Sequence, residues 1–427
     1  MSIVWDVAYL FALVAFFPVV LYRMITRGKY RHGLLERLGF VPRRTGGREC
    51  LWVHGVSMGE VLASRTLVAA FRERHPDWDV VVSTTTDTGR AAALRHFPDC
   101  TVFRYPLDFS FAVAASLARV RPSVVVLMEL ELWPNFTRAC ERRGVPVLIV
   151  NGRLSERGHR RQHRFRFVLG PSYARVSRIG AQTERYARRF VDVGAPPGRV
   201  VVTGSMKYDA ASPEPGDVAP LRRELALAPD AAILVAGSTF AGEDEIVLDV
   251  YARVKRDFPA LRLAIVPRHP ERADVVASLI RARGFDVLRR SNPSTGPTPD
   301  AVILGDTTGE LVRFYALASV VFVGKSLVTP GGGQNIIEPA ALGKPVLFGP
   351  HMDNFRETRD RLLEADAARE VADAGSLAAA VTQLLSDKDL ATAMGGRARA
   401  ALRDARGATR RTLELVEETL ASRAGTV

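Results

Sequence analysis

The chain has few cysteines, and they lack the spacing that binds zinc. Only three of its 427 residues are cysteine, at positions 50, 100 and 140. A scattered, odd set without a Cys-x-x-Cys pair predicts no structural zinc site and favours a reducing compartment. No short-period repeat is present. The glycine-rich segment at 331–333 also lacks the Gly-Lys-Ser/Thr ending of a Walker loop.

Acidic residues are outnumbered, with 59 Lys and Arg against 46 Asp and Glu, for a net charge of +13. A basic excess indicates nucleic acid, an anionic membrane or an acidic substrate as partner. The basic residues do not alternate with aromatic residues as they do in single-strand binding surfaces. They follow the apolar N-terminus instead, at Arg23, Arg27, Lys29, Arg31 and Arg37, and recur at 157–166. This pattern favours a membrane surface, although a compositional preference for arginine explains part of the excess.

Residues 3–22 form a nearly continuous apolar run, broken only by Asp6 and Pro18. A helix of about 20 residues can cross a bilayer, and no small-residue cleavage site follows the run. The basic flank predicts that the rest of the chain lies on the cytoplasmic side. We therefore expect residues 1–24 to form an N-terminal membrane-anchor helix, either a transmembrane helix or one that lies in the interface.

Downstream, short apolar runs alternate with helical patterns, which is typical of parallel α/β sheets. In the first half the runs are 51–53, 80–83, 124–128, 147–150, 179–181 and 200–203, and in the second half 233–236, 263–266, 302–304, 320–323 and 346–348. The stretch 210–220, rich in proline and acids, is interpreted as a linker. The sequence thus predicts two Rossmann-like domains, 45–209 and 221–390, that face a central cleft, and a C-terminal helical segment at 391–427.

The first half places acids where strands lead into helices, at the sheet edge where α/β proteins bind ligands. Glu60 ends the segment HGVSMGE at 54–60 and is either a general base or an acid that complements the helix dipole. The segment MELELWPN at 128–135 supplies Glu129 and Glu131. One of these carboxylates is suited to face an acceptor, whereas Glu131 is interpreted as a solvated loop acid. Lys207 follows a later strand, where a salt bridge is the commoner role than a phosphate clamp.

The second half carries features that suit a nucleotide. Arg268, in PRHPER at 267–272, can hold a phosphate with two N–H groups. In GKSLVTPGGGQNIIEP at 324–339, the glycines allow the backbone to approach an anion and Asn335 can cap the next helix, whose free N–H groups then face a phosphate. Glu338 is placed to accept hydrogen bonds from ribose. A merely flexible loop explains the glycines but not the Asn-x-x-Glu-Pro. Acids in one half and nucleotide features in the other are what a two-domain glycosyltransferase requires.

These segments, together with RLS at 153–155, GSMK at 204–207 and DTTGEL at 306–311, resemble the Kdo transferases of lipid A assembly, in the same order up to about residue 355. Members of that family move 3-deoxy-D-manno-octulosonic acid (Kdo) from CMP-Kdo to lipid IVA. The resemblance implies a GT-B glycosyltransferase on the cytoplasmic side of the inner membrane. It also implies an inverting reaction without a covalent intermediate, a cofactor or a required metal.

The resemblance also implies roles for residues of this chain. Glu60 matches the general base, and Glu129 and Lys207 match residues that stabilise the transition state. The CMP contacts match Arg268, His269, Thr308, Gly309, Glu310, Asn335, Ile336, Ile337 and Glu338. The implied partners are CMP-Kdo, lipid IVA and the inner-membrane lipid surface, and not nucleic acid.

One loop departs from the family pattern, which reads Gly-Gly-Ser-Leu-Val, then two residues and Gly-Gly-His-Asn. Here Lys325 replaces the second glycine, and Gly333-Gln334 stands where the histidine would be, one residue longer. The departure puts the phosphate geometry in question.

Two other classes of protein fit part of the sequence. Nucleotide-sugar 2-epimerases share the two Rossmann-like domains, but the apolar N-terminus counts against them. A basic, membrane-bound or nucleic-acid-binding protein without enzymatic activity explains the charge, but not acids and phosphate loops at successive strand ends. Release of CMP from CMP-Kdo discriminates among these interpretations.

Overall fold

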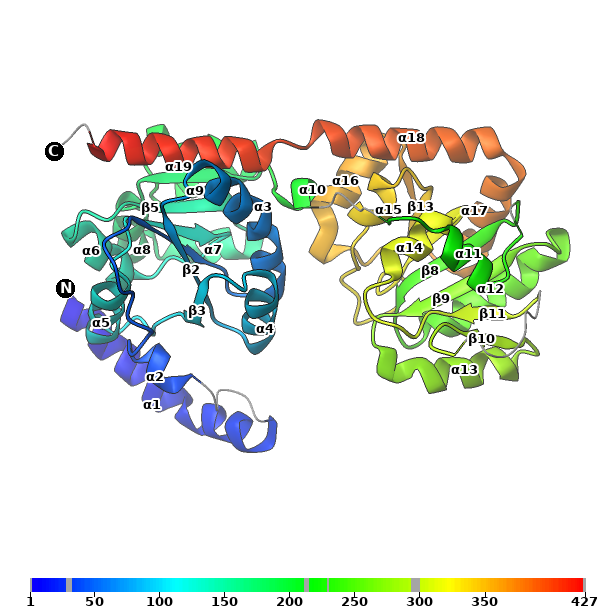
Figure 1. Ribbon diagram of the computed structural model, residues 1–427, viewed down its shortest axis with the longest axis horizontal. Helices are drawn as coiled ribbons and strands as arrows, with labels where there is room; N and C mark the ends of the chain where they lie inside the picture. The colour runs from blue at the N-terminus through cyan, green and yellow to red at the C-terminus, as the bar shows by residue number, and fades with distance from the viewer. Residues whose placement is uncertain (1, 28–32, 211–214, 229, 293–299, 425–427) are drawn as a thin grey trace. The chain divides into compact units, whose positions relative to one another are not determined.

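A computed structural model describes residues 2–27, 33–210, 215–228, 230–292 and 300–424 (Figure 1). The chain divides into two compact units: unit 1 is residues 1–210 and 406–427, and unit 2 is residues 211–405. Each unit is built around one parallel sheet, as the sequence predicts. Of the predicted linker at 210–220, residues 211–214 lie outside the described residues.

Unit 1 contains a seven-stranded sheet in the order β3-β2-β1-β4-β5-β6-β7. Every pairing in it is parallel. The strands are β1 Cys50–His54, β2 Asp79–Thr84, β3 Thr101–Arg104, β4 Val124–Met128, β5 Val147–Gly152, β6 Arg178–Ala181 and β7 Val200–Val202. The strand order reverses between β1 and β4, and such a reversal opens a crevice beyond the carboxyl ends of the two strands.

Helices cover both faces of this sheet (Figure 1). One face packs on α5 (Ser110–Val120), α6 (Pro134–Arg142), α8 (Arg166–Ala174) and α9 (Glu184–Asp192). The other packs on α3 (Met58–Arg74), α4 (Asp87–His96) and α19 (Ala408–Ala424). The remaining helices of this unit are α1 Ser2–Arg27, α2 Leu34–Arg37, α7 Glu156–Arg164 and α10 Lys207–Ala210, with a 3-10 turn at Pro197–Arg199. The C-terminal helix α19 thus completes the core of unit 1, because its Leu413 and Val416 are buried there.

Unit 2 contains a second seven-stranded parallel sheet, in the order β10-β11-β9-β8-β12-β13-β14. Its strands are β8 Ile233–Thr239, β9 Arg262–Pro267, β10 Val287–Arg289, β11 Val302–Leu304, β12 Val320–Val323, β13 Val346–Phe348 and β14 Ala368–Glu370. Its helices are α11 Ala219–Glu224, α12 Glu243–Asp257, α13 Ala273–Ala282, α14 Leu311–Leu317, α15 Ile337–Ala341, α16 Arg356–Glu364, α17 Ala374–Ser386 and α18 Lys388–Asp404, with 3-10 turns at Pro270–Arg272 and Asp353–Phe355. Here the order reverses between β8 and β12.

Helix α1 contacts the rest of unit 1 through its first turns. Asp6 accepts hydrogen bonds from the backbone N–H of Ser110 (2.8 Å) and the side chain of Asn135 (3.0 Å). Tyr9 packs against Trp133, with ring centroids 6.2 Å apart. Most of its other described apolar side chains are exposed, among them Phe11 at 73%.

The predicted transmembrane anchor is not supported. Across the residues that the structure describes, no helix combines the length and the apolar character that a bilayer crossing needs. Within the predicted basic flank, Lys29 and Arg31 lie outside the described residues. The hydrogen-bonded Asp6 and the proline within α1 interrupt the apolar sequence of this helix.

Candidate active site

In unit 1, the predicted acids lie at the point where the strand order reverses. The loop after β1 carries Glu60, and the chain beyond β4 carries Glu129 and Glu131. Loops at the carboxyl ends of adjacent parallel strands share one edge of the sheet, so the sequence alone brings these acids to one crevice.

Glu60 is held rigidly in the first turn of α3. The Ser57 hydroxyl accepts a hydrogen bond from the Glu60 backbone N–H (3.3 Å) and donates one to Glu60 Oε1 (2.8 Å). The backbone N–H of Val56 donates to Glu60 Oε2 (2.9 Å). Ser57 therefore caps the helix and orients the carboxylate at the same time.

The surroundings of Glu60 make it a stronger base than an ordinary carboxylate. Burial raises its pKa, the hydrogen bond from Val56 opposes that change, and the negative charge of Glu129 raises the pKa further. The net result is a pKa above the usual carboxyl value. General bases work best when their pKa approaches the working pH, so this direction suits proton abstraction.

Glu129 and Lys207 form an ion pair beside Glu60. The Lys207 ammonium at the start of α10 lies 3.3 Å from Glu129 Oε1. Glu129 adopts a positive φ of 57°, so the chain leaves the extended conformation as soon as β4 ends. Positive φ is costly for a residue with a side chain and is concentrated at functional sites. Lys207 thus forms the salt bridge that the sequence favoured.

Glu131 is less solvated than its sequence context suggests. Its carboxylate accepts a hydrogen bond from Trp133 Nε1 (2.9 Å). Burial raises the pKa of Glu131 to about 7. The hydrogen bond from Trp133 opposes this increase, and the negative charge of Glu60 adds to it. The interpretation of Glu131 as a solvated loop acid is therefore wrong, because it belongs to the same cluster of carboxylates.

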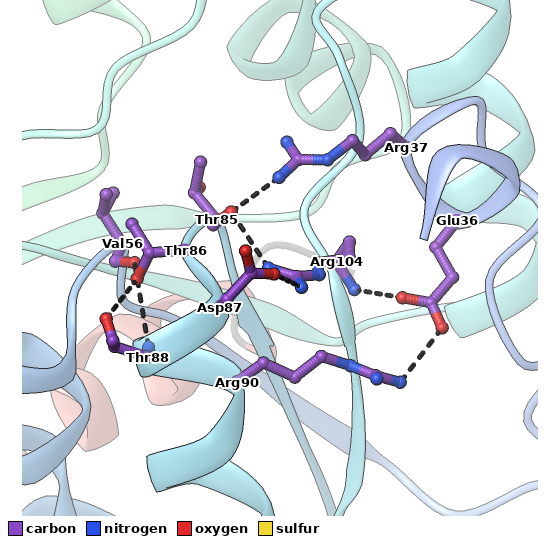
Figure 2. A network of polar contacts seen from close by, with 10 residues as sticks. Glu36, Arg37, Val56, Thr85, Thr86, Asp87, Thr88, Arg90 and Arg104 are labelled. Carbon is purple, nitrogen blue, oxygen red and sulfur yellow. Dashed lines mark hydrogen bonds and ion pairs between the residues drawn. The ribbon is translucent and has the colours of Figure 1, made fainter. Parts of the chain in front are cut away.

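A polar network fixes the loop before α3, which contains Val56, to the loop before α4 (Figure 2). The Thr86 hydroxyl donates to the carbonyl of Val56 (2.9 Å) and caps α4 by accepting from Gly89 N–H (3.0 Å). The carbonyl of Thr85 accepts from the side chains of Arg37 (2.6 Å) and Arg104 (3.2 Å). Since Val56 also donates to Glu60, these hydroxyls and guanidinium groups position the carboxylate.

His54 does not compete with Glu60 for the role of base. Its ring is fully buried, stacks on Tyr105 with centroids 3.8 Å apart, and lies 2.9 Å from the Ser83 hydroxyl through Nδ1. Burial lowers the pKa of His54 to about 3. The imidazole is therefore neutral and serves the packing of unit 1.

In unit 2, the predicted nucleotide features gather around β8, β9 and β12. The backbone N–H of Arg268 donates to the carbonyl of Thr239 (3.1 Å), which joins the loops after β9 and β8. The His269 ring meets the edge of Phe240, with centroids 5.4 Å apart. These contacts place Arg268 and His269 at the carboxyl edge of the sheet.

Asn335 bonds to the start of the next helix, as the sequence suggests, and also to Glu338, which the sequence does not predict. The Asn335 carbonyl oxygen accepts from Ile337 N–H (3.0 Å), and its amide donates to Glu338 Oε1 (2.9 Å). Burial raises the pKa of Glu338, whereas the hydrogen bond from Asn335 and the positive charge of Arg268 lower it; the net change is an increase. Because α15 has only five residues, its dipole is weak. Ile336 and Ile337 are buried, and the backbone N–H of Ile337 already donates to Asn335.

The predicted donor contacts at 308–310 differ among themselves. Thr308 and Gly309 are exposed in the loop after β11. Glu310 is instead engaged within the protein: Arg290 Nε donates to it at 3.0 Å, Arg313 at 2.9 Å and the Thr307 hydroxyl at 2.5 Å. The carboxylate of Glu310 therefore fixes the shape of this loop.

Glu243 is a site residue that sequence reasoning did not select. Its fully buried carboxylate accepts hydrogen bonds from four backbone N–H groups, those of Phe240 (3.0 Å), Lys325 (2.6 Å), Ser326 (2.8 Å) and Leu327 (2.9 Å). It thereby ties the loop after β8 to the loop after β12. An acid that opens α12 after a small-residue turn is its only sequence signal, and dipole-compatible acids are common there.

Metal chemistry finds no candidate ligand set in the described part of the chain, where no cluster of His, Cys, Asp and Glu is arranged to hold an ion.

Comparison with known proteins places these residues in a family context. The family described as "3-Deoxy-D-manno-octulosonic-acid transferase (kdotransferase)" matches residues 32–210. A 3-deoxy-D-manno-octulosonic acid transferase from Haemophilus influenzae is 35% identical, over 91% of this chain and 92% of that protein. A protein of the same name from Bordetella pertussis is 37% identical, over 87% of each chain.

Solved structures share the fold at much lower identity. A UDP-N-acetylglucosamine 2-epimerase matches with a TM-score of 0.59 and 15% identity, over 88% of this chain and 96% of that one. A glycosyltransferase from Rickettsia africae matches with a TM-score of 0.57 and 12% identity, over 88% and 99%. This likeness concerns the fold alone, and it agrees with the predicted GT-B class.

Proposed function

This chain belongs to the 3-deoxy-D-manno-octulosonic acid (Kdo) transferase family, and we propose that it transfers Kdo from CMP-Kdo to the lipid A precursor lipid IVA. Kdo transfer in lipopolysaccharide biosynthesis is the activity of the family. The donor, the acceptor and the residue roles that follow are our assignments.

Glu60 is the general base in this proposal. Its carboxylate takes the proton of an acceptor hydroxyl while that oxygen attacks the anomeric carbon of Kdo. The bond from that carbon to the phosphate oxygen breaks, and its electron pair leaves with CMP. The phosphate leaves as an anion and needs no proton, so a single base suffices. The configuration inverts because the acceptor oxygen displaces the phosphate in one step, from the opposite face of the anomeric carbon. The observation that carries this assignment is the fixed, desolvated carboxylate of Glu60 beside Glu129.

Glu129 and Lys207 act as a pair. The negative charge of Glu129 favours the positive charge that develops on the sugar, and Lys207 holds Glu129 in place across 3.3 Å. Fixed charges aimed at the charge of a transition state are among the strongest catalytic effects available to proteins.

The donor nucleotide binds unit 2. Arg268 is suited to the phosphate, because a guanidinium offers paired donors. Glu338 and Asn335 are suited to the ribose hydroxyls. His269, Thr308 and Gly309 complete the rim, and Ile336 and Ile337 contribute backbone groups. Glu310 supports the loop beneath them through Arg290 and Arg313.

The acceptor is a lipid, so we propose that unit 1 works at the cytoplasmic surface of the inner membrane. Two features support this: the exposed apolar side chains of α1, and a second exposed patch at the junction of α7 and α8. That patch joins Phe165 and Phe167, the latter 84% exposed, to the arginines at 157, 160, 161, 164 and 166. Apolar side chains beside cations are typical of proteins that lie on anionic lipid surfaces.

The mass of the acceptor after reaction tests the function. Purified protein with CMP-Kdo and lipid IVA should release CMP and increase the acceptor mass by whole Kdo residues. UDP-N-acetylglucosamine without acceptor serves as the control for epimerase chemistry and should remain unchanged. A protein that releases no CMP with any lipid A precursor would refute the proposed donor and acceptor.

A further inference from the structure

Lys325 stands at the point where the strand order of unit 2 reverses, directly after β12. Its backbone is fixed on both sides: its N–H donates to Glu243 Oε2 (2.6 Å), and its carbonyl accepts from Gly333 N–H (2.8 Å). Its φ is 57°, in the left-handed region that favours glycine. A lysine occupies this position although glycine would suit the backbone better, which points to a role for the lysine side chain.

The ammonium of Lys325 points toward the predicted nucleotide contacts. It lies 5.0 Å from the centroid of the Phe240 ring, and the edge of that ring meets His269, the neighbour of Arg268. The loops after β8, β9 and β12 thus bring the Lys325 ammonium and the His269 ring to one aromatic side chain, Phe240, and Arg268 is the chain neighbour of His269. A cation near an aromatic face keeps a defined position at little cost.

In the part of the chain that the structure describes, the Lys325 ammonium forms no ion pair with a carboxylate, although the Lys325 backbone N–H donates to Glu243. There, the lysines in ion pairs with carboxylates are Lys207 and Lys255. Lys325 is half-buried, and a partly desolvated cation without an anion is unfavourable. A ring quadrupole offsets only part of this cost. A phosphate group would provide the charge-assisted hydrogen bond that the described carboxylates do not give this ammonium.

We propose that Lys325 binds the phosphate of the nucleotide donor, opposite Arg268, and is a further donor-binding residue of this enzyme. The inference rests on the proposed function, since it names the group of the donor that Lys325 contacts. It also gives one reason for two departures from the family pattern. The added lysine and the Gly333-Gln334 segment that lacks the histidine are joined by the hydrogen bond between Gly333 and Lys325.

The variant Lys325→Gly tests the proposal, because glycine accepts the positive φ and removes only the side chain. Titration calorimetry measures the Kd for CMP, which has the phosphate, and the Kd for cytidine, which lacks it. We expect the Kd for CMP to rise roughly tenfold, the effect of one charge-assisted hydrogen bond. The Kd for cytidine should stay within about twofold, and Lys325→Arg should retain most of the affinity for CMP. Lys388→Ala, at an exposed lysine that begins α18, is the matched control and should change neither.

Each other outcome has a defined meaning. Unchanged CMP affinity in Lys325→Gly overturns the proposal, as does an equal loss for CMP and cytidine, which would assign the lysine to the shape of the loop. If the wild-type protein binds cytidine and CMP equally well, Lys325 has no phosphate role. Failure of the wild type to bind any cytidine nucleotide would refute the proposed donor itself.

Discussion

At the scale of single residues, the chemistry of unit 1 depends on how like charges are balanced. Glu129 raises the pKa of Glu60, Glu60 in turn raises the pKa of Glu131, and Lys207 compensates Glu129 at 3.3 Å. Three acids near one ammonium cannot all ionise at ordinary cost. The protonation of Glu60 is therefore adjustable through its neighbours.

This coupling predicts how activity depends on pH. A base works when deprotonated, so the rate falls as the pH drops through the raised pKa of Glu60. Glu129→Gln removes a negative charge and should move this acidic limb of kcat/KM to lower pH, by roughly half a unit. Initial rates of CMP release across pH measure the limb. The control variant Glu141→Gln, at a surface partner of Arg175, should leave the acidic limb at its wild-type pH. If the limb of Glu129→Gln also stays at its wild-type pH, Glu129 does not influence the pKa of the base.

The sequence predicted that Glu60 and Glu129 lie at strand ends, but not how their environments are built. Glu60 follows a strand within a recognisable segment, so its place was predictable. The desolvation of Glu131 and the four backbone bonds of Glu243 arise from contacts between loops far apart in the chain. The positive φ of Lys325 has no sequence signal either, because the residue that adopts it is not glycine.

At the scale of elements, the apolar strands were predictable, and three edge strands that contain arginine were not. All eleven expected runs are strands in the structure, whereas β3, β10 and β14 were not expected. The unexpected strands have four residues or fewer, include arginine, and lie at or near sheet edges. Because each contains a charged residue, these strands lack the uninterrupted apolar run that predicted the others, and pairing with a neighbouring strand decides their structure.

The return of the chain through α19 gives a prediction at this scale. Leu413 is 2% exposed and packs in the core of unit 1. Leu413→Ala should lower the free energy of unfolding by about 3 kcal/mol, because it leaves a cavity. All four tryptophans, at 5, 52, 78 and 133, belong to unit 1, so their fluorescence during urea unfolding reports on this unit alone. Arg410→Ala, which removes an exposed pair with Glu414, should cost less than about 1 kcal/mol. Equal effects would mean that α19 adds little to the core.

At the scale of the whole molecule, the proposal of a lipid acceptor predicts binding to membranes. Vesicles that contain an anionic phospholipid should retain the protein at low salt and release it as salt rises, since each basic residue near the surface contributes about 1 kcal/mol. Phe11→Ser with Phe16→Ser, at side chains 73% and 65% exposed, should weaken retention with little effect on folding. Val275→Ser, at a residue 57% exposed in unit 2, is the control. Equal retention of both variants would contradict a lipid contact through α1.

The central claim is that Glu60 takes the proton of the acceptor, and one variant tests it most directly. In Glu60→Gln the amide keeps an acceptor for Val56 N–H and a donor for the Ser57 hydroxyl, so the geometry of the loop is preserved while the base is lost. Turnover with CMP-Kdo and lipid IVA, measured together with the Kd for CMP, gives the answer. The account predicts that kcat falls by about 10²–10⁴ while the Kd for CMP stays unchanged. Turnover of Glu60→Gln at the wild-type rate would contradict it.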